Sequence, residues 1–315
     1  IAAQVWKTKE GDPEVEVEKK IAAVAATWRT RYEAQGELVY YFELKSTPGN
    51  LFLYDVDGDT PVLIGAASLV GNIMDGTPHR VVLKDDFVYV ATWRKGIQFV
   101  DLRSLAKSLE GVAPYGVNGY NWQLSNNGFA RDLVSTIPVS GYLNDLEAGN
   151  FMLDGSSVPV VFATGSKPEA TLVVASPSTS AVPIYQGQVN GAAGSLSRGE
   201  AITLAHIGSR DLALVGGLGQ TKCPDPPAGC LVHSGGVLAI VDIGNPKAPS
   251  LVSMVKLDAL PQDIIVKDTT ALVSGGGFVT LVNIGDPTLP FVAGRLAGVG
   301  SRMALSDQNI LLSTD

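Results

Sequence analysis

The hydrophobic pattern is clearest over residues 262–294, QDIIVKDTTALVSGGGFVTLVNIGDPTLPFVAG. Short apolar, β-branched runs are separated there by Asp-Thr, by a glycine run and by Gly-Asp-Pro. Runs of this kind, bounded by turn-forming residues, predict four antiparallel strands in succession. One such unit cannot bury both of its faces alone, so we expect copies of it elsewhere in the chain.

Copies of the first two strands occur at three places that align without a gap. They are PHRVVLKDDFVYVA at 78–91, PQDIIVKDTTALVS at 261–274 and GSRMALSDQNILLS at 300–313. Each has a polar start, a strand, a turn that begins with an aspartate (Asp85, Asp268 or Asp307) and a second strand. A third strand follows at 96–102 and at 277–284. The period of about 40 to 50 residues is the size of one propeller blade.

We therefore predict an all-β fold, a single β-propeller domain over residues 1–315 with four-stranded antiparallel blades. The predicted strands are 21–28, 37–45, 50–56 and 61–69 in blade one; 79–84, 87–93, 97–102 and part of 132–139 in blade two; 150–154, 158–165, 170–176 and 181–189 in blade three; 201–207, 211–217, 237–243 and 249–257 in blade four; blade five is the stretch 262–294. Insertions are expected at about 103–130, where 104–111 reads as one or two helical turns, and at about 219–235.

Closure of the ring is predicted from the two ends of the chain. A sixth blade begins at Ser301 and stops after two strands, whereas residues 1–20 offer two strands, IAAQVWKT and EVEVEKK, without inner partners. We expect residues 1–20 to complete the blade whose inner strands lie in 301–313, because a shared closing blade leaves no open sheet edge. Six blades are favoured, and seven, with one hidden in 103–148, is the alternative.

Two segments carry a family resemblance, GGVLAIVDIGNPKAPSLVSM at 235–254 and GFVTLVNIGDPTLPFVAG at 277–294. An LVIVD-like strand, a short turn with Asp or Asn and Pro, and a second Pro before the outer strand resemble the LVIVD-repeat β-propellers of bacterial and archaeal surface proteins. The pattern is weaker at GIQFVDL and NLFLYDVDGDTPVLIG. The resemblance implies a secreted or envelope-exposed propeller, one module of a larger protein, and no particular reaction.

Composition narrows the class of partner. Hydrophobic residues make up 45% of the chain and charged residues 17%, with 35 Gly and 18 Pro, which suits many short strands joined by tight turns. The net charge of -8 and the lack of a Lys/Arg cluster argue against a nucleic-acid surface. No apolar run reaches the roughly 20 residues of a membrane-spanning helix. The chain starts at Ile1 without Met or a signal peptide, and we expect a processed or excised piece.

Two motifs suggest a disulfide and a cation. Cys223 and Cys230 flank a proline-rich loop that a disulfide closes in an oxidising compartment; unpaired thiols and a zinc site with His233 are the alternatives. Asp55, Asp57 and Asp59 resemble the start of a calcium loop, but Ala66 stands where an EF-hand has Glu, so a plain turn is favoured. No other cofactor is predicted.

The candidate ligand-binding residues come from two regions. Propeller geometry would place the strand entrances and nearby turns around a central channel; these residues are His79, Arg80, Trp93, Arg94, Asp263 and Arg302. They either bind a ligand or pair with one another across the channel. Tyr120 and Trp122 lie in an aromatic, amide-rich segment that suits carbohydrate or protein contacts, or that packs on itself. His206, inside an apolar strand, is expected to be packed with a hydrogen-bond partner.

These observations favour a non-catalytic extracellular scaffold or binding module, on the cell surface, secreted or periplasmic, with a protein or carbohydrate partner. The alternative is a propeller enzyme, a polysaccharide lyase or hydrolase with its site at the central depression. That chemistry requires a carboxylate pair or a Tyr/His/Arg group in a cleft. No such constellation is evident, so no catalytic residue is assigned and the question of enzymatic activity stays open.

Overall fold

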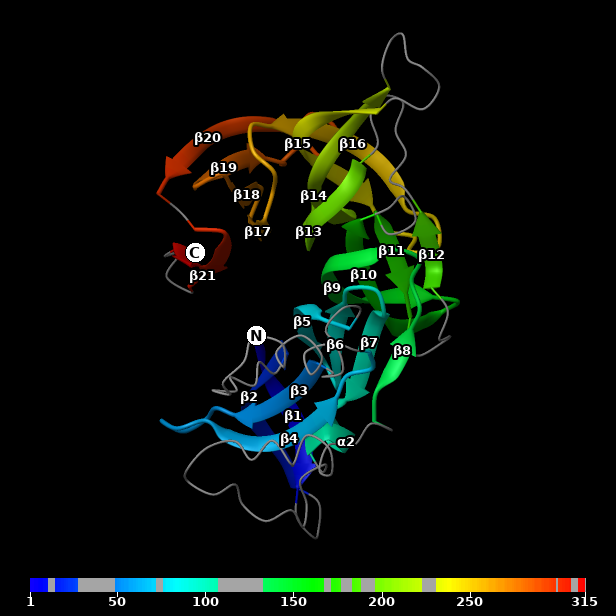
Figure 1. The fold of residues 1–315 in the computed structure, drawn as a ribbon, viewed down its shortest axis with the longest axis vertical. Helices are drawn as coiled ribbons and strands as arrows, with labels where there is room; N and C mark the ends of the chain where they lie inside the picture. The colour runs from blue at the N-terminus through cyan, green and yellow to red at the C-terminus, as the bar shows by residue number, and fades with distance from the viewer. Residues whose placement is uncertain are drawn as a thin grey trace, which may run out of the picture. The chain divides into compact units, whose positions relative to one another are not determined.

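The computed structural model describes residues 1–10, 15–27, 49–71, 76–106, 133–166, 171–176, 183–187, 196–222, 231–298, 300–306 and 311–314. Strands dominate these residues (Figure 1). The chain divides into two compact units, Ile1–Pro138 and Val139–Asp315, and each is described by itself. The strands fall into consecutive antiparallel sets, which we call blades, with strands A to D in chain order.

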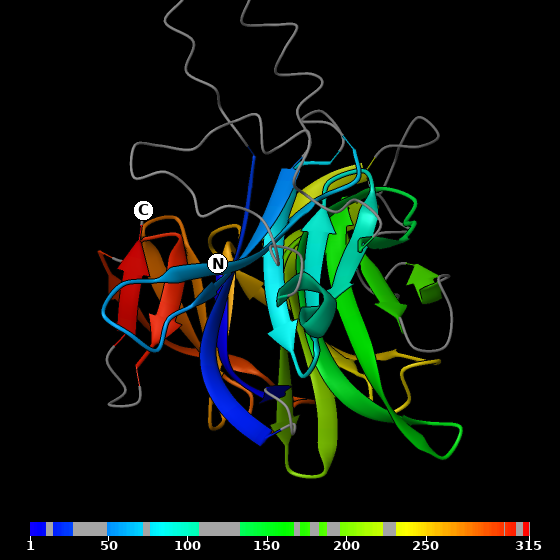
Figure 2. The ribbon, with the colours of Figure 1, turned by 90° about the horizontal axis from the view of Figure 1, so that it is seen from below.

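Unit 1 contains two four-stranded blades. Blade one has the order β1 (Ala2–Glu10), β2 (Val15–Thr27), β3 (Gly49–Asp55), β4 (Val62–Ser68), and blade two the order β5 (Pro78–Lys84), β6 (Phe87–Thr92), β7 (Gly96–Asp101), β8 (Ser135–Ile137). A short helix, α2 (Leu102–Ala106), follows β7, and Figure 2 shows it beside the strands of blade two. The fully buried Leu102 and Leu105 of α2 join a core shared by both blades.

Unit 2 contains the remaining blades. Blade three is β9 (Tyr142–Leu153), β10 (Ser156–Ser166), β11 (Leu172–Ala175) and β12 (Pro183–Gly187); blade four is β13 (Leu196–Ile207), β14 (Arg210–Lys222), β15 (Leu231–Asp242) and β16 (Ser250–Leu257); blade five is β17 (Asp263–Lys267), β18 (Thr270–Gly275), β19 (Phe278–Asn283) and β20 (Phe291–Ala297). The sixth set has two described strands, β21 (Arg302–Leu305) and β22 (Leu311–Thr314). One pair, Ser166 opposite Arg198, joins blades three and four into one eight-stranded sheet.

The turns between strands A and B follow the chemistry that the repeat predicts. Asp85, Asp154 and Asp268 have positive φ angles of 51, 52 and 49 degrees, and Gly208 takes the equivalent place in blade four with 65 degrees. Two-residue hairpin turns need positive φ, which Asp and Gly adopt more readily than most residues. The aspartates at Asp85 and Asp268 thus set the register of their hairpins, as the aligned repeats suggest.

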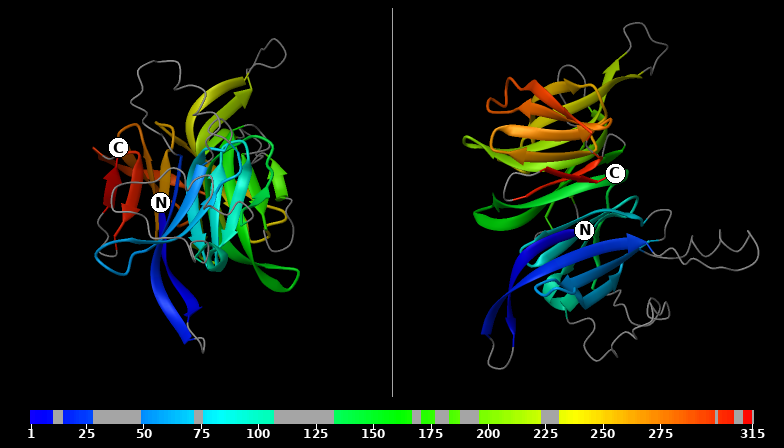
Figure 3. Two further views of the ribbon diagram at one scale, coloured as in Figure 1. Left: turned by 60° about the horizontal axis from the view of Figure 1, so that its bottom comes forward. Right: turned by 90° about the vertical axis from the view of Figure 1, so that its left-hand side faces the viewer.

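The predicted all-β propeller architecture is confirmed, and most predicted strands are found within a few residues of their expected bounds. Strands β13, β14 and β15 extend well beyond the predicted apolar runs. Figure 3 shows β14 and β15 projecting as a long twisted hairpin from their sheet. The predicted strand 37–45 lies outside the described residues, as does nearly all of the insertion at 103–130.

The predicted position of residues 1–20 is corrected by the sheet topology. β1 pairs with β2, and β2 pairs with β3, so residues 1–20 supply the first two strands of blade one and not the outer strands of the blade at 301–313. The segments EVEVEKK and IAAVAATW, predicted as separate strands, form the single strand β2. In the described chain β21 and β22 pair only with each other.

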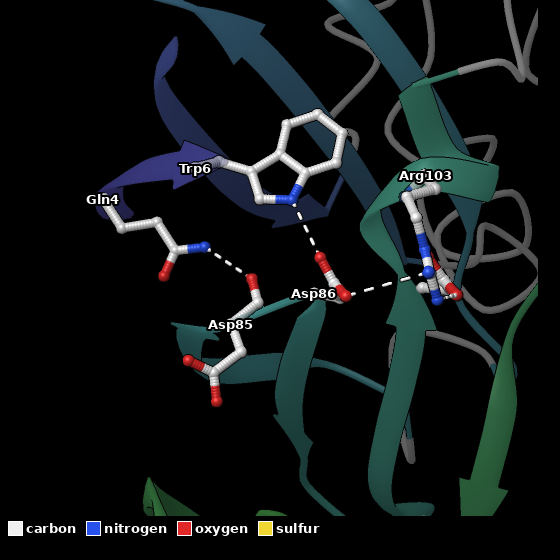
Figure 4. A network of polar contacts seen from close by, with 6 residues as sticks. Gln4, Trp6, Asp85, Asp86 and Arg103 are labelled. Atoms are coloured by element: carbon white, nitrogen blue, oxygen red, sulfur yellow. Dashed lines mark hydrogen bonds and ion pairs between the residues drawn. The ribbon is translucent and has the colours of Figure 1, made fainter. Parts of the chain in front are cut away.

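Side-chain contacts also join the N-terminal strand of blade one to blade two (Figure 4). The buried Trp6 of β1 donates from Nε1 to Asp86 Oδ1 at 3.2 Å, and Gln4 donates to the Asp85 carbonyl at 2.9 Å. Asp86 also lies 3.8 Å from the guanidinium of Arg103. Hydrogen bonds from Arg103 lower the pKa of Asp101, so the α2 end of the network stays charged. Strand β1 is therefore held against the A–B turn of blade two.

The cores lie between consecutive blades. One cluster in unit 1 joins Trp6, Ile21 and Leu53 of blade one to Val81 and Val88 of blade two. In unit 2, one cluster joins blades three and four, and a second joins blade four to blade five. Blades one and two, blades three and four, and blades four and five thus bury faces against each other, as expected for stacked repeats.

Candidate functional site

Two buried aspartates join neighbouring blades in unit 2. Asp263, on strand A of blade five, accepts hydrogen bonds from the N–H of the following residue at 3.1 Å and from the Met303 N–H of the next blade at 2.8 Å. Asp145, on strand A of blade three, accepts from the following N–H at 3.0 Å and from the Ile202 N–H of blade four at 2.9 Å. We call each arrangement an aspartate clasp. Backbone donors bind both oxygens of each carboxylate, so each clasp connects two neighbouring blades.

Polar side chains gather beside the Asp145 clasp, where strands A of blades three and four begin. We call this edge of a blade, at the start of its strand A, the entrance edge. Asn144 donates from Nδ2 to the Gly199 carbonyl at 2.8 Å and to Glu200 Oε2 at 3.2 Å. The Glu200 carboxylate also forms an ion pair with Arg198. Gly199 allows this close packing, because a Cβ there would lie 1.7 Å from Thr164 Oγ1. The result is a small polar cluster of Asn144, Arg198 and Glu200 at the entrance edge.

The electrostatics of this cluster centre on Glu200. Burial raises the pKa of its carboxyl group, while the charge of Arg198 and the bond from it act in the opposite direction. Arg198 itself stays about half exposed. A partly desolvated carboxyl beside an accessible guanidinium can donate or accept a proton and can bind hydroxyl groups of a ligand.

The predicted residues of blade two lie at one edge of their sheet. The Trp93 N–H donates to the Thr77 carbonyl at 3.0 Å, which holds the B–C turn against the start of strand A. The guanidinium of Arg94 stacks over the Trp93 ring, 4.8 Å from its centroid. His79, which is exposed, and Arg80, which is half-buried, follow on β5. The entrance edge of blade two therefore presents an aromatic ring with a stacked cation.

The buried side-chain amide of Gln98 connects the entrance edge of blade two to blade one. Gln98, on β7, accepts from the Val70 N–H at 2.7 Å and donates to the Val70 carbonyl at 2.7 Å. Its Nε2 also donates to Thr92 Oγ1 at 3.1 Å. Because Thr92 immediately precedes Trp93, the amide of Gln98 fixes the turn relative to blade one.

The LVIVD repeat family matches residues 75–106 and 230–256. These segments cover strands A to C of blade two and strands C and D of blade four. The chain carries LVIVD repeats. The two matched segments have the strand order and turns that the resemblance implied, so that identification is confirmed.

One solved structure supports the fold of this LVIVD-repeat chain. This chain is similar to a chain in the crystal structure of the mitotic checkpoint complex, with 11% identity, a TM-score of 0.51, and coverage of 84% of this chain and 66% of that one. Sqt1 from Chaetomium thermophilum matches with 13% identity, a TM-score of 0.48 and coverage of 80% and 57%. The chain thus spans less than two thirds of either structure. No curated protein matches the sequence.

The LVIVD-repeat chain distributes the predicted site residues over both units. His79, Arg80, Trp93 and Arg94 lie in unit 1, and Asp263 and the exposed Arg302 lie in unit 2. Their arrangement around one channel stays a prediction. Tyr120, Trp122, Cys223 and Cys230 lie outside the described residues. Sequence reasoning missed Asn144 and Glu200; the signal for Glu200 was a glutamate directly before the apolar run of a strand A, in LSRGEAITL.

The aspartates of the calcium-like motif are used by the turn. Asp55 Oδ1 accepts from the Asp57 N–H at 3.0 Å, and Asp57 Oδ2 accepts from the Lys20 N–H at 3.1 Å. Asp59 is exposed beyond them. No group of three or more His, Cys, Asp or Glu side chains that could hold a metal ion occurs in the described part of the chain. These bonds match the turn interpretation of the motif.

His206 differs from its expected environment. Its Nδ1 lies 2.7 Å from Asp211 Oδ1, so the predicted hydrogen-bond partner is present. The side chain is exposed rather than packed, because it lies directly before the A–B turn of blade four. The pair lines an open hollow of about 200 Å³ whose other walls include Phe151, Leu204 and Ile243. The lining residues of the hollow include no serine, threonine, cysteine or lysine.

Proposed function

We propose that this LVIVD-repeat propeller is a non-catalytic binding module that recognises a protein or carbohydrate through the entrance edge of blade two. The observation that carries the proposal is the stacked pair of Arg94 and Trp93. An indole ring and a guanidinium together suit the apolar face of a sugar and a carboxylate or acidic side chain. The Trp93 N–H binds the Thr77 carbonyl, and Gln98 donates to Thr92, the residue before Trp93. These hydrogen bonds fix the turn that carries the pair, so the site is preorganised for a ligand.

The LVIVD match supports a place for the module in a secreted or surface protein, and we propose an extracellular, cell-surface or periplasmic setting. A ligand at the cell surface is consistent with the acidic composition, since a net charge of -8 discourages binding to nucleic acid. Among the described residues, no helix has the length and apolar character that a membrane crossing requires.

The test is a binding screen with a matched control. Acidic and neutral glycans and acidic peptides are titrated into the wild-type chain and into Trp93→Ala and Arg94→Ala. We expect about tenfold weaker binding in either variant, because each removes one half of a desolvated contact. The control is Arg295→Ala, which removes the cation stacked at 5.1 Å over Phe278 in blade five. Unchanged binding in Trp93→Ala, or no binding by the wild type, would remove this edge from consideration.

One observation favours the second candidate, a propeller enzyme that acts on polysaccharide. Glu200 is a partly buried carboxyl group with a raised pKa at the entrance edge of unit 2, which suits a general acid. The neighbouring carboxylate of Asp145 is occupied by backbone donors, so the pair that glycoside hydrolysis uses is not formed by these two groups. Release of reducing ends or unsaturated sugars from polysaccharides by the wild type, abolished in Glu200→Gln, would establish this function.

A further inference from the structure

The acidic residues of unit 1 gather at the edge that carries its A–B and C–D turns, which we call the turn edge. Every aspartate and glutamate that the structure describes in unit 1 lies there: at positions 10, 16 and 18 of the β1–β2 hairpin, in the turn 55–59, and in blade two at Asp85, Asp86 and Asp101. Basic side chains accompany them, because Lys7 pairs with Glu18 at 2.9 Å and Arg103 pairs with Asp101 at 2.6 Å. Figure 4 shows Arg103 beside Asp86 in this group. These cations thus have carboxylate partners within unit 1.

The entrance edge of blade two has the opposite charge. It comprises the start of strand A, residues 76–80, and the B–C turn with its flanks, residues 92–96. The hydrogen bond from Trp93 to Thr77 holds these two segments side by side. They contain no acidic residue, and their basic residues are His79, Arg80, Arg94 and Lys95. In a chain with a net charge of -8, this edge is therefore a local concentration of positive charge.

Two entrance edges of unit 2 show a different use of arginine. At blade four, Arg198 forms an ion pair with Glu200 on the same strand A. Arg295, near the end of strand D of blade five, forms an ion pair with Asp258, which follows strand D of blade four. Each of these arginines meets a carboxylate that belongs to the fold. Blade two differs because its described entrance edge combines several cations with an aromatic ring and supplies no carboxylate.

We propose that the ligand of this edge is a polyuronate, an anionic polysaccharide whose sugar rings carry carboxylates; the inference rests on the binding role proposed above for blade two. One uronate residue presents an apolar ring face and a carboxylate together. The ring face contacts the half-buried Trp93, and the carboxylate accepts hydrogen bonds from Arg94 or Lys95. An acidic peptide supplies the carboxylate without the ring, and a neutral glycan supplies the ring without the charge.

The experiment separates ring from charge in the ligand and local from overall charge in the protein. Calorimetric titration compares oligogalacturonate and oligomannuronate with their methyl esters, which keep the ring and lose the charge, and with oligoglutamate, which keeps the charge and lacks the ring. The protein is the 1–315 chain as wild type, Trp93→Ala and Lys95→Gln. The matched control is Lys84→Gln, which removes the same charge directly before the A–B turn of blade two, at the turn edge.

We expect the wild type to bind at least one oligouronate, and to bind its methyl ester and oligoglutamate about tenfold or more weakly, because each lacks one half of the contact. Trp93→Ala and Lys95→Gln should weaken uronate binding similarly, and Lys84→Gln should bind like the wild type. Affinity should fall as salt rises, because salt screens exposed charges.

Several results would overturn the polyuronate. Equal binding of acid and ester, or tighter binding of oligoglutamate, with a loss in Trp93→Ala, would overturn it and leave the binding edge of blade two in place. Binding of neither uronate, or equal losses in Lys84→Gln and Lys95→Gln, would overturn it as well. Uronate binding that neither Trp93→Ala nor Lys95→Gln weakens would overturn both this inference and the proposed function.

Discussion

The carboxylate of Asp263 is almost fully buried, and its surroundings explain how the charge is tolerated. Two backbone N–H groups, one from the neighbouring blade, replace its hydration. Hydrogen bonds to a charged acceptor are stronger than neutral ones, and the loss of the acceptor leaves both donors buried without partners. The Asp263 side chain thus stabilises the fold through its hydrogen bond to the neighbouring blade.

We expect Asp263→Ala to lower the free energy of unfolding by about 2 to 4 kcal/mol, since it removes a charged acceptor of two backbone donors. Urea denaturation followed by circular dichroism measures the change. Asp145→Ala should behave alike, whereas Asp59→Ala, at an exposed carboxylate, should change the free energy of unfolding little. Equal stability of Asp263→Ala and Asp59→Ala would contradict the clasp.

Glu200 gives a pH-dependent prediction. Burial raises its folded pKa above its ordinary value of 4.5, so in the pH range just above 4.5 the folded state binds more of this proton than the unfolded state. Its contribution to stability is therefore greatest at and below pH 4.5 and declines as pH rises through the folded pKa. Thermal unfolding of the wild type and of Glu200→Gln from pH 4 to 7 tests this. The variant should lack that decline, and parallel profiles would show that Glu200 is not the responsible group.

At the scale of elements, the repeat predicted strand positions better than strand lengths. In blade four, one apolar run ends near residue 217 and the next begins near residue 237. The strands are longer, because β14 continues to Lys222 and β15 already begins at Leu231. Each extension is held by cross-strand pairing with the other, which no local hydrophobic pattern reveals. His206 illustrates the same limit, because exposure at a strand end depends on neighbours distant in sequence.

The disulfide prediction concerns two cysteines outside the described residues of this hairpin. The last described pair is Lys222 opposite Leu231, and Cys223 and Cys230 are the next residue on each side. We expect a bond worth ~2 to 3 kcal/mol at most for so short a loop. Intact mass with and without reductant, after alkylation, measures it; two alkylated thiols in the unreduced protein would contradict it.

The N-terminal strands show what the sequence left undetermined. Two strands without inner partners suggested the outer half of the last blade, because residues 37–45 also read as a strand and appeared to complete blade one. The structure instead pairs β2 directly with β3 and buries Trp6 against blade two. A partner for Trp6, the Asp86 carboxylate, lies 80 residues away in sequence, and composition and periodicity carry no signal for such a contact.

For the whole molecule, the prediction of one domain over residues 1–315 can be tested through Trp6. Replacing this buried indole with Ala should cost about 3 to 5 kcal/mol in unit 1, through lost packing and the lost bond to Asp86. Differential scanning calorimetry then separates two outcomes. If the chain unfolds as one domain, a single transition shifts to lower temperature; if units 1 and 2 unfold separately, only one of two transitions shifts.

The aspartate clasps also bear on the order in which the chain folds. The carboxylate of Asp145 contacts a backbone group 57 residues later, and that of Asp263 one 40 residues later. Contacts between consecutive blades keep the contact order low for an all-β protein, and each added blade closes a loop of similar, modest entropy. Folding can therefore start in one pair of blades and propagate along the chain, with each clasp formed as the next strand A arrives.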